Sequence, residues 1–192
     1  SKDLDRYVKK AIEGMSSEEQ DHFHDHMYDE YVNTSDMLPR LQWYAQFMVV
    51  NATFEHAMDE LCRIVERRSS KEPSFRGMKG QGIVRAKSFL QKAGVKTPFQ
   101  TPAWQRAQLM REIRNLIAHR NGEIDCTRID QGSLVKRLKK EKNVKLKTLV
   151  DGQEDAQIDF DSEFVRQAII DLRQVLVSVC NYELFPEDGA DE

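Results

Sequence analysis

Residues 101–122 read TPAWQRAQLMREIRNLIAHRNG and carry signals for both ends of a helix. Thr101 is an N-cap residue whose hydroxyl can accept a hydrogen bond from an early helical N–H, and Pro102 suits the first helical position. Asn121 and Gly122 tolerate the left-handed conformation in which helices often end. One apolar face comes from residues at three- and four-residue spacing: Leu109, Met110, Ile113, Leu116 and Ile117. The stretch therefore predicts a capped, amphipathic helix.

Polar side chains gather toward the end of this helix: Arg111, Arg114, Asn115, His119 and Arg120. Among them, residues 114–119 read RNLIAH, which resembles the R-x4-6-H signature of HEPN domains, with Asn115 as the polar residue that commonly follows the arginine. The resemblance implies a HEPN-like helical bundle over most of the chain, from about residue 36 to residue 182. It also implies the chemistry of the family, which is metal-independent cleavage of RNA.

The resemblance assigns catalytic roles to Arg114, Asn115 and His119. In the family's reaction the ribose 2′-OH attacks its own 3′ phosphate, which leaves a cyclic phosphate and a 5′-OH. His119 suits the proton transfer, because an imidazole titrates close to neutral pH. Arg114 suits stabilisation of the phosphorane, because a guanidinium is always charged and offers two parallel donors to phosphate. We expect Asn115 to orient one of these groups or to hold a phosphate oxygen.

Helix geometry separates the arginine and the histidine of the motif. Five residues along an ideal helix turn the side-chain direction by about 140° and rise about 7.5 Å, so Arg114 and His119 do not share a face. Arg111, Asn115 and His119 do share one. Either the helix loosens near Asn121, or two copies of the chain build the site together. The resemblance implies the second arrangement, a composite cleft in a homodimer.

A structural role is the alternative for both motif residues. Arg114 can form an ion pair with Glu55 or near Glu112, and His119 can bond the carbonyls at the helix end, where the helix dipole favours a cation. Phe54 and Glu55 resemble an aromatic–acid pair that some HEPN families place on the preceding helix, where the acid can pair with the motif arginine. A solvent-facing Glu55 is the other interpretation of these two residues.

The composition is that of a soluble globular protein. The chain has 192 residues, 40% hydrophobic and 32% charged, which suffices for one domain with a proper core. No apolar run approaches the roughly 20 residues that span a bilayer. The first residues contain no hydrophobic signal core, so we expect no export. Cys62, Cys126 and Cys180 are widely spaced and form no CxxC pair. We therefore expect reduced thiols, a cytoplasmic protein, and neither disulfides nor a membrane partner.

Residues 1–192 are expected to form a single all-α domain with a small β-hairpin inserted before the last helix. Besides the central helix, periodicity predicts helices over about 3–14, 41–67, 83–93, 133–140 and 161–182. Ser17 and Gln20 indicate a capping box for a further helix that ends near residue 32, and residues 33–36 indicate a turn. Val144, Leu146 and Leu149 alternate with lysines, so the hairpin spans about 144–160. The acidic tail, residues 186–192, is expected to be disordered.

Charge is unevenly distributed along the chain. The net charge is −3, yet the segment from Lys136 to Lys147 holds seven basic residues against the single acid Glu141. Because phosphate contacts dominate nucleic-acid affinity, we expect RNA to contact a basic set. That set consists of Arg111, Arg120, Lys136, Arg137, Lys139 and Lys140. The segment lacks aromatic residues that stack on bases, so these contacts would not be sequence-specific. A solvated hairpin surface is the alternative.

Other kinds of site find little support. His22 and His26 have the i, i+4 spacing of a metal pair, with His24 between them, but without a clear third ligand a solvated polar face explains them better. We expect no metal and no cofactor. Gly-rich phosphate loops, GxSxG elbows and HExxH motifs are absent from the sequence.

The sequence thus predicts a dimeric, metal-independent endoribonuclease of the toxin–antitoxin or phage-defence type. Proteins of this kind are commonly restrained by a partner, so an inhibitory partner protein is expected, although no residue identifies one. The alternative is a HEPN-like module that binds a nucleotide, RNA or a protein without cleaving it.

Overall fold

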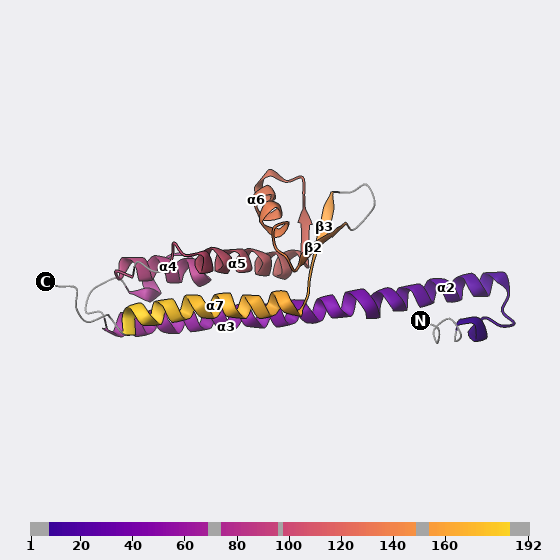
Figure 1. The fold of residues 1–192 in the computed structure, drawn as a ribbon, viewed down its shortest axis with the longest axis horizontal. Coiled ribbons are helices and arrows are strands. Elements are labelled where there is room, and N and C mark those ends of the chain that lie inside the picture. Colours follow the sequence, from indigo (N-terminus) through magenta and orange to yellow (C-terminus); the bar gives the residue numbers. More distant parts are fainter. Residues whose placement is uncertain (1–7, 69–73, 96–97, 149–153, 185–192) are drawn as a thin grey trace. The chain divides into compact units, whose positions relative to one another are not determined.

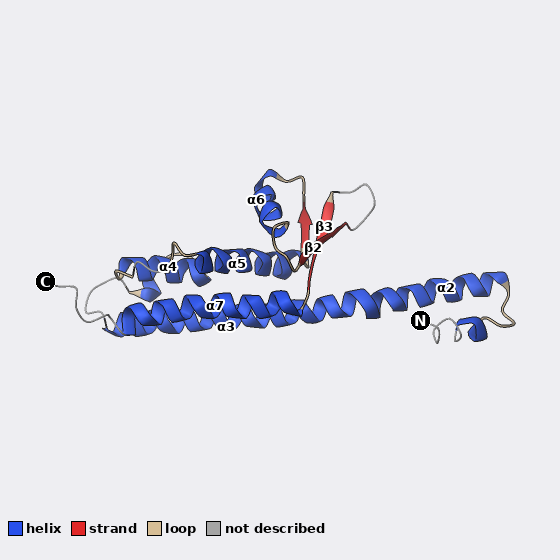
Figure 2. Ribbon diagram, viewed as in Figure 1, coloured by secondary structure: helices blue, strands red, loops and turns tan. Residues whose placement is uncertain are grey.

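The computed structural model describes residues 8–68, 74–95, 98–148 and 154–184, and most of these residues lie in helices, with one small sheet (Figures 1 and 2). The mainly helical class predicted from the sequence is therefore confirmed. The elements follow in the order α2 (Ser17–Val32), η1 (Asn33–Met37), α3 (Leu38–Arg68), η2 (Phe75–Gly77), α4 (Gly82–Lys92), α5 (Pro102–Arg120), β1 (Glu123–Asp125), α6 (Ile129–Leu138), β2 (Val144–Thr148), β3 (Asp155–Phe160) and α7 (Ser162–Leu184). Within the described ranges, no helix has the length and apolar character needed to cross a membrane.

The chain divides into two compact units, residues 1–42 and residues 43–192. In the first unit, α2 begins with a capping box. The backbone N–H of Ser16 donates to the Glu19 carboxylate (2.7 Å), and the Glu19 N–H donates to the Ser16 hydroxyl (3.3 Å). The predicted pair, Ser17 and Gln20, is therefore wrong by one residue, because both pairs satisfy the same S-x-x-E/Q spacing.

The segment after α2 does not form the predicted turn. Residues 33–37 instead continue the helical backbone as the π-helix η1, which leads into α3 at Leu38. The Thr34 hydroxyl donates to the Glu30 carbonyl at 2.7 Å, four residues earlier, so it bonds within the helical backbone. Side chains of Thr, Ser, Asn and Asp favour turns when they replace backbone hydrogen bonds of a helix. The Thr34 hydroxyl does not do so here, because it bonds to a carbonyl of the helix itself.

The core of the second unit is built from side chains of α3, α4, α5 and α7, with further residues from the sheet. α3 buries Tyr44, Phe47, Asn51, Phe54, Met58, Cys62 and Val65, which recur at three- and four-residue spacing as the sequence predicts. In Figure 1, α7 follows the part of α3 that belongs to this unit, with α4 and α5 as the neighbouring helices. The first turn of α7 is capped by Asp161, whose carboxylate accepts from the N–H groups of Glu163 (3.0 Å) and Phe164 (3.1 Å).

An aromatic cluster joins three elements of this core. The Phe160 ring of β3 lies 5.3 Å from the rings of Tyr44 and Phe47 on α3 and 4.9 Å from Phe164 on α7, centroid to centroid. These four side chains are at most 4% exposed. Because aromatic pairs at such separations add to the stabilisation from burial alone, the cluster fixes the sheet on the helices.

The sheet has three antiparallel strands in the order β1-β3-β2. The predicted hairpin is confirmed by β2 and β3, in which Val144 pairs with Phe160 and Thr148 with Ala156. The segment expected to form its turn, with Leu149, lies outside the described residues, as does the acidic tail. The sequence did not predict β1, because three residues are too few to show a period of two.

Candidate functional site

α5 has the limits that the sequence predicts. The N-H of Trp104 donates to the Thr101 hydroxyl at 3.2 Å, and Pro102 occupies the first turn. At the other end Asn121 adopts a left-handed conformation (φ 50°), and Gly122 has φ 81°. The N–H groups of both residues donate to the carbonyl of Leu116. Backbone groups therefore satisfy this carbonyl, which fixes the position at which the motif helix ends.

Arg114 points toward α3, where its guanidinium forms an ion pair with the Glu55 carboxylate. Both side chains are about one quarter exposed, at 25% and 26%, so the pair is partly shielded from water. The solvent-facing alternative for Glu55 is therefore wrong. The sequence offers two interpretations of a pair between Glu55 and Arg114: the acid–arginine contact that the family resemblance implies, and a purely structural ion pair. The observed contact agrees with both.

The N-terminus of α4 lies against the same carboxylate. Gly82 has φ 51°, and a Cβ atom at this position would come within 2.7 Å of Glu55 Oε1. Only glycine allows the backbone to approach the Glu55 carboxylate this closely while adopting this conformation. Gly82 falls just outside the helix predicted over residues 83–93, and no pattern in the sequence indicates this contact, since the two residues meet only when α3 and α4 pack together.

His119 lies on an exposed part of α5 and makes no hydrogen bond or ion pair with any residue that the structure describes. It therefore does not cap the helix end, where the Leu116 carbonyl already accepts from backbone N–H groups. α5 remains α-helical through Arg120, so the helix does not loosen between Arg114 and His119. Their side chains keep the divergence of about 140° expected of a regular helix. Asn115 and Arg111, which share a face with His119, are half-buried.

The basic residues expected to contact RNA differ in how they are engaged. Arg137 on α6 forms an ion pair with Glu112 on α5, through contacts of 2.8 and 2.9 Å to the two carboxylate oxygens. Lys136, Lys139 and Lys140 are exposed. Arg137 thus holds α6 against the motif helix, while the three lysines leave a positively charged surface on and just after α6.

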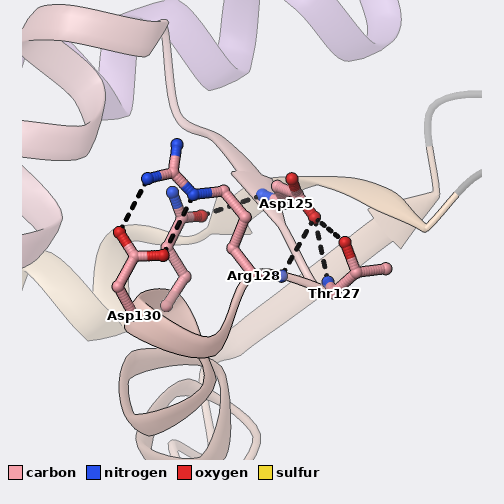
Figure 3. A network of polar contacts seen from close by, with 5 residues as sticks. Asp125, Thr127, Arg128 and Asp130 are labelled. Carbon is pink, nitrogen blue, oxygen red and sulfur yellow. Dashed lines mark hydrogen bonds and ion pairs between the residues drawn. The ribbon is translucent and has the colours of Figure 1, made fainter.

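A polar network sets the start of α6 (Figure 3). The Asp125 carboxylate at the end of β1 accepts from the N–H and hydroxyl of Thr127 (2.9 and 2.6 Å) and from the N–H of Arg128 (3.3 Å). Hydrogen bonds from the Thr127 hydroxyl, above all, lower the pKa of Asp125. Arg128 in turn pairs with Asp130 at 2.8 and 3.0 Å. This turn directs the chain from the sheet into the basic helix.

A second arginine on α5 joins three segments. Arg106 pairs with Glu141, at 2.8 and 2.9 Å, and with Asp171 of α7, which is buried. Burial lowers the pKa of the Arg106 guanidinium, but the hydrogen bonds to Glu141 and Asp171 outweigh this effect and raise it. These groups border a hollow of about 570 Å³ whose basic and acidic lining residues balance. Arg106 therefore acts as a structural clamp.

The histidines of the first unit form no metal centre with the described residues. His22, His24 and His26 are exposed, and His26 lies 3.5 Å from Glu30. Across the described parts of the chain, no group of three or more His, Cys, Asp or Glu side chains is arranged to hold a metal ion.

Comparison of the chain with protein-family models, with curated proteins and with solved structures finds no match. The assignment of function therefore depends on the residues of α5 and their surroundings.

Proposed function

We propose that this protein is a metal-independent endoribonuclease with a HEPN-like fold, of the toxin–antitoxin or phage-defence type, and that it acts as a homodimer. One observation supports this proposal above the others. The arginine of the RNLIAH motif is oriented by a carboxylate on α3, while its histidine is exposed near the end of a regular helix and bonds to none of the residues that the structure describes.

In this proposal the two motif residues act on one phosphodiester. His119 transfers the proton that the 2′-OH loses or the 5′ oxygen gains, and Arg114 stabilises the additional negative charge on the phosphorane. Glu55 positions Arg114 without consuming its binding capacity, because a guanidinium carries five N–H donors in a fixed planar arrangement. Asn115, one residue along α5, orients the phosphate. Lys136, Lys139 and Lys140 hold the flanking RNA through its phosphates.

The divergence of Arg114 and His119 on a regular helix is the reason for proposing a dimer. In one copy the two side chains are turned apart by about 140°. Two copies related by a twofold axis can bring the arginine of one copy to the histidine of the other, and the symmetry then produces two equal sites. A partner protein that covers this interface would restrain the activity.

Cleavage of a mixed tRNA and mRNA pool in EDTA tests the chemistry. Because general acid–base catalysis contributes about 10²- to 10⁴-fold, His119→Ala should remove most of the activity, and Arg114→Ala should do the same. His56→Ala is the matched control, because His56 is an exposed histidine on α3 outside the motif. Products should carry a cyclic phosphate and a 5′-OH. Equal activity in all four proteins would assign the cleavage to another site or to a contaminant.

Mixing the two inactive variants tests the composite site. If each site combines Arg114 of one copy with His119 of the other, a heterodimer of Arg114→Ala and His119→Ala contains one intact site. Random exchange should then restore about a quarter of the wild-type sites. No recovery, with exchange verified by mass spectrometry, would show that one copy supplies both residues or that the pair is not catalytic.

A binding module without catalysis is the second candidate, and the Arg114–Glu55 pair is the observation that favours it. An arginine neutralised by a carboxylate can serve the fold alone, since partly buried pairs are often structural. Lack of cleavage of any RNA by the wild-type protein, together with RNA binding unaffected by His119→Ala, would favour this candidate over the nuclease.

A further inference from the structure

A hollow of about 320 Å³ opens at the C-terminal end of α3, and its lining includes no residue of the RNLIAH motif. Its lining, called here the arginine pocket, consists of Arg63, Glu66, Arg67, Phe75, Arg76 and Arg85. α3 contributes the first three residues, η2 the next two and α4 the last. Four guanidinium groups from three segments therefore surround one concave space.

Part of this arrangement fixes the walls of the pocket. Arg85 pairs with Asp59 of α3 at 2.6 Å, and its guanidinium lies 4.5 Å from the centroid of the Phe75 ring. Arg63 pairs with Glu60. The Phe75 ring contacts the Arg85 guanidinium from the protein interior. Because Phe75 is only 3% exposed, it has no free face on which an aromatic ligand could stack. Arg85 is thereby held in one orientation by a carboxylate and an aromatic ring.

The single carboxylate among the lining residues is already occupied. Glu66 accepts the backbone N–H of Phe75 at 2.8 Å. This hydrogen bond, followed by one from the Ser74 hydroxyl, lowers the pKa of Glu66. Its role is to hold η2 against α3. Arg67 and Arg76 form no ion pair or hydrogen bond with any residue among those described. Among the described residues, therefore, these two guanidiniums border the hollow without a hydrogen-bonding partner. The positive charges of Arg76 and Arg63 also contribute to the lowered pKa of Glu66.

Arg63 and Arg85 are each paired with a carboxylate, so the excess positive charge at the hollow comes from Arg67 and Arg76. Two like charges beside one concave space favour an anion between them. A guanidinium can offer two parallel N–H donors to one phosphoryl group, which suits phosphate better than a spherical anion. A volume of about 320 Å³ lies at the small end of ligand sites, which indicates a compact ligand. No exposed aromatic side chain lines the pocket to stack successive bases of a nucleic acid.

We propose that the arginine pocket binds the diphosphate group of a small ligand, with Arg67 and Arg76 each holding one phosphoryl group. Arg63 and Arg85 supply the surrounding positive charge. The site is separate from the RNLIAH motif, so this inference does not depend on the proposed ribonuclease activity. Free pyrophosphate and a nucleoside diphosphate present the same chemistry, and the experiment distinguishes between them.

Isothermal titration of the whole chain with sodium pyrophosphate, ADP and inorganic phosphate tests the proposal. We expect pyrophosphate or ADP to bind more tightly than phosphate. The variant Arg67→Gln/Arg76→Gln should bind about 100-fold more weakly, at about tenfold for each charged hydrogen-bonding group lost. Tighter binding of ADP than of pyrophosphate would show that the pocket also recognises the nucleoside. Tighter binding of pyrophosphate would identify the free diphosphate as the preferred ligand.

Arg173→Gln is the matched control, because Arg173 is an exposed arginine of α7 outside the pocket. Equal weakening in this variant would show general attraction to positive charge and would overturn the proposal, as would unchanged binding in the double variant or no binding of either diphosphate. A short RNA without terminal phosphates that binds through Arg67 and Arg76, while the small ligands fail, would overturn it in favour of a nucleic-acid site. Thermal unfolding of each variant checks that the fold is retained.

Discussion

Gly122 follows the C-terminal cap of the motif helix, where both the backbone conformation and the nearby Tyr44 ring favour glycine. Its φ of 81° lies in the left-handed region, and a Cβ atom here would lie 2.7 Å from Cζ of the Tyr44 ring and closer still to its hydroxyl. Tyr44 is 3% exposed, and its hydroxyl donates to the carbonyl of Ile158 on β3. The substitution Gly122→Ala must therefore displace a buried ring and its hydrogen bond.

The cost separates into two parts. An alanine in the left-handed region costs about 1–2 kcal/mol. Loss of the Tyr44 hydrogen bond leaves a buried carbonyl unsatisfied, which adds about 1–3 kcal/mol. Gly94 supplies a reference for the first part alone, because it has φ 99° and a Cβ atom there would meet nothing within 4 Å. Gly122→Ala should therefore destabilise the protein by about 1–3 kcal/mol more than Gly94→Ala.

Urea unfolding of both variants measures this difference, and the melting temperature should differ by about 2–4 °C for each kcal/mol. A double-mutant cycle with Tyr44→Phe identifies the cause. Tyr44→Phe already removes the hydroxyl that the alanine would meet. The double variant should therefore be destabilised by less than the sum of the two single variants. Equal destabilisation by the two alanine variants, or strict additivity in the cycle, would refute the close contact between Gly122 and Tyr44.

Three further outcomes are expected. Glu55→Gln should lower the melting temperature by about 2–4 °C, since it removes a partly shielded ion pair worth about 1 kcal/mol, and no change would show that Arg114 does not depend on it. Burial raises the pKa of the fully buried Cys62 thiol to about 12, against 9.0 in the unfolded chain. The folded protein then holds this proton to higher pH, so stability that is present below pH 9 should be lost toward pH 12. Urea midpoints on either side of pH 9 measure this loss, and a profile unchanged by Cys62→Ala would contradict the assignment. Arg106→Leu leaves the buried Asp171 without its ion pair, with the Gln167 amide as its remaining hydrogen-bond donor among the described residues, which should cost about 3 kcal/mol in urea unfolding. A loss below about 1 kcal/mol would contradict the clamp.

Local signals along the chain were sufficient for most helices. The limits of α5 follow from Thr101, Pro102 and the pair Asn121-Gly122, because caps act on the backbone within one turn. Near α2 the same local rules indicated a capping box one residue later than the one that forms, and a turn that does not form. The residues at 33–37 are compatible with a turn and with a continued helix. The Thr34 hydroxyl can bond locally in a turn, and in the helix it bonds equally well to the Glu30 carbonyl.

Parts of the candidate site depend on contacts between distant segments. The sequence offered Glu55 as a partner for Arg114 only as one of two interpretations, and the packing of α3 against α5 decided between them. No sequence pattern predicted the approach of Gly82 to Glu55 or the clamp formed by Arg106. Each of these contacts joins residues of different helices or segments that are far apart in the sequence, so the spacing of residues along one helix does not predict it.

The sequence by itself determined the helical class, the hairpin and the motif helix with its basic and polar end. These properties depend on spacing, capping and composition, which act over a few residues. Only the tertiary structure decided that Arg114 faces a carboxylate while His119 is exposed, and that four arginines from α3, η2 and α4 surround one hollow. The physical reason is that electrostatic interactions and burial depend on distance in space, and folding alone brings these segments within reach of one another.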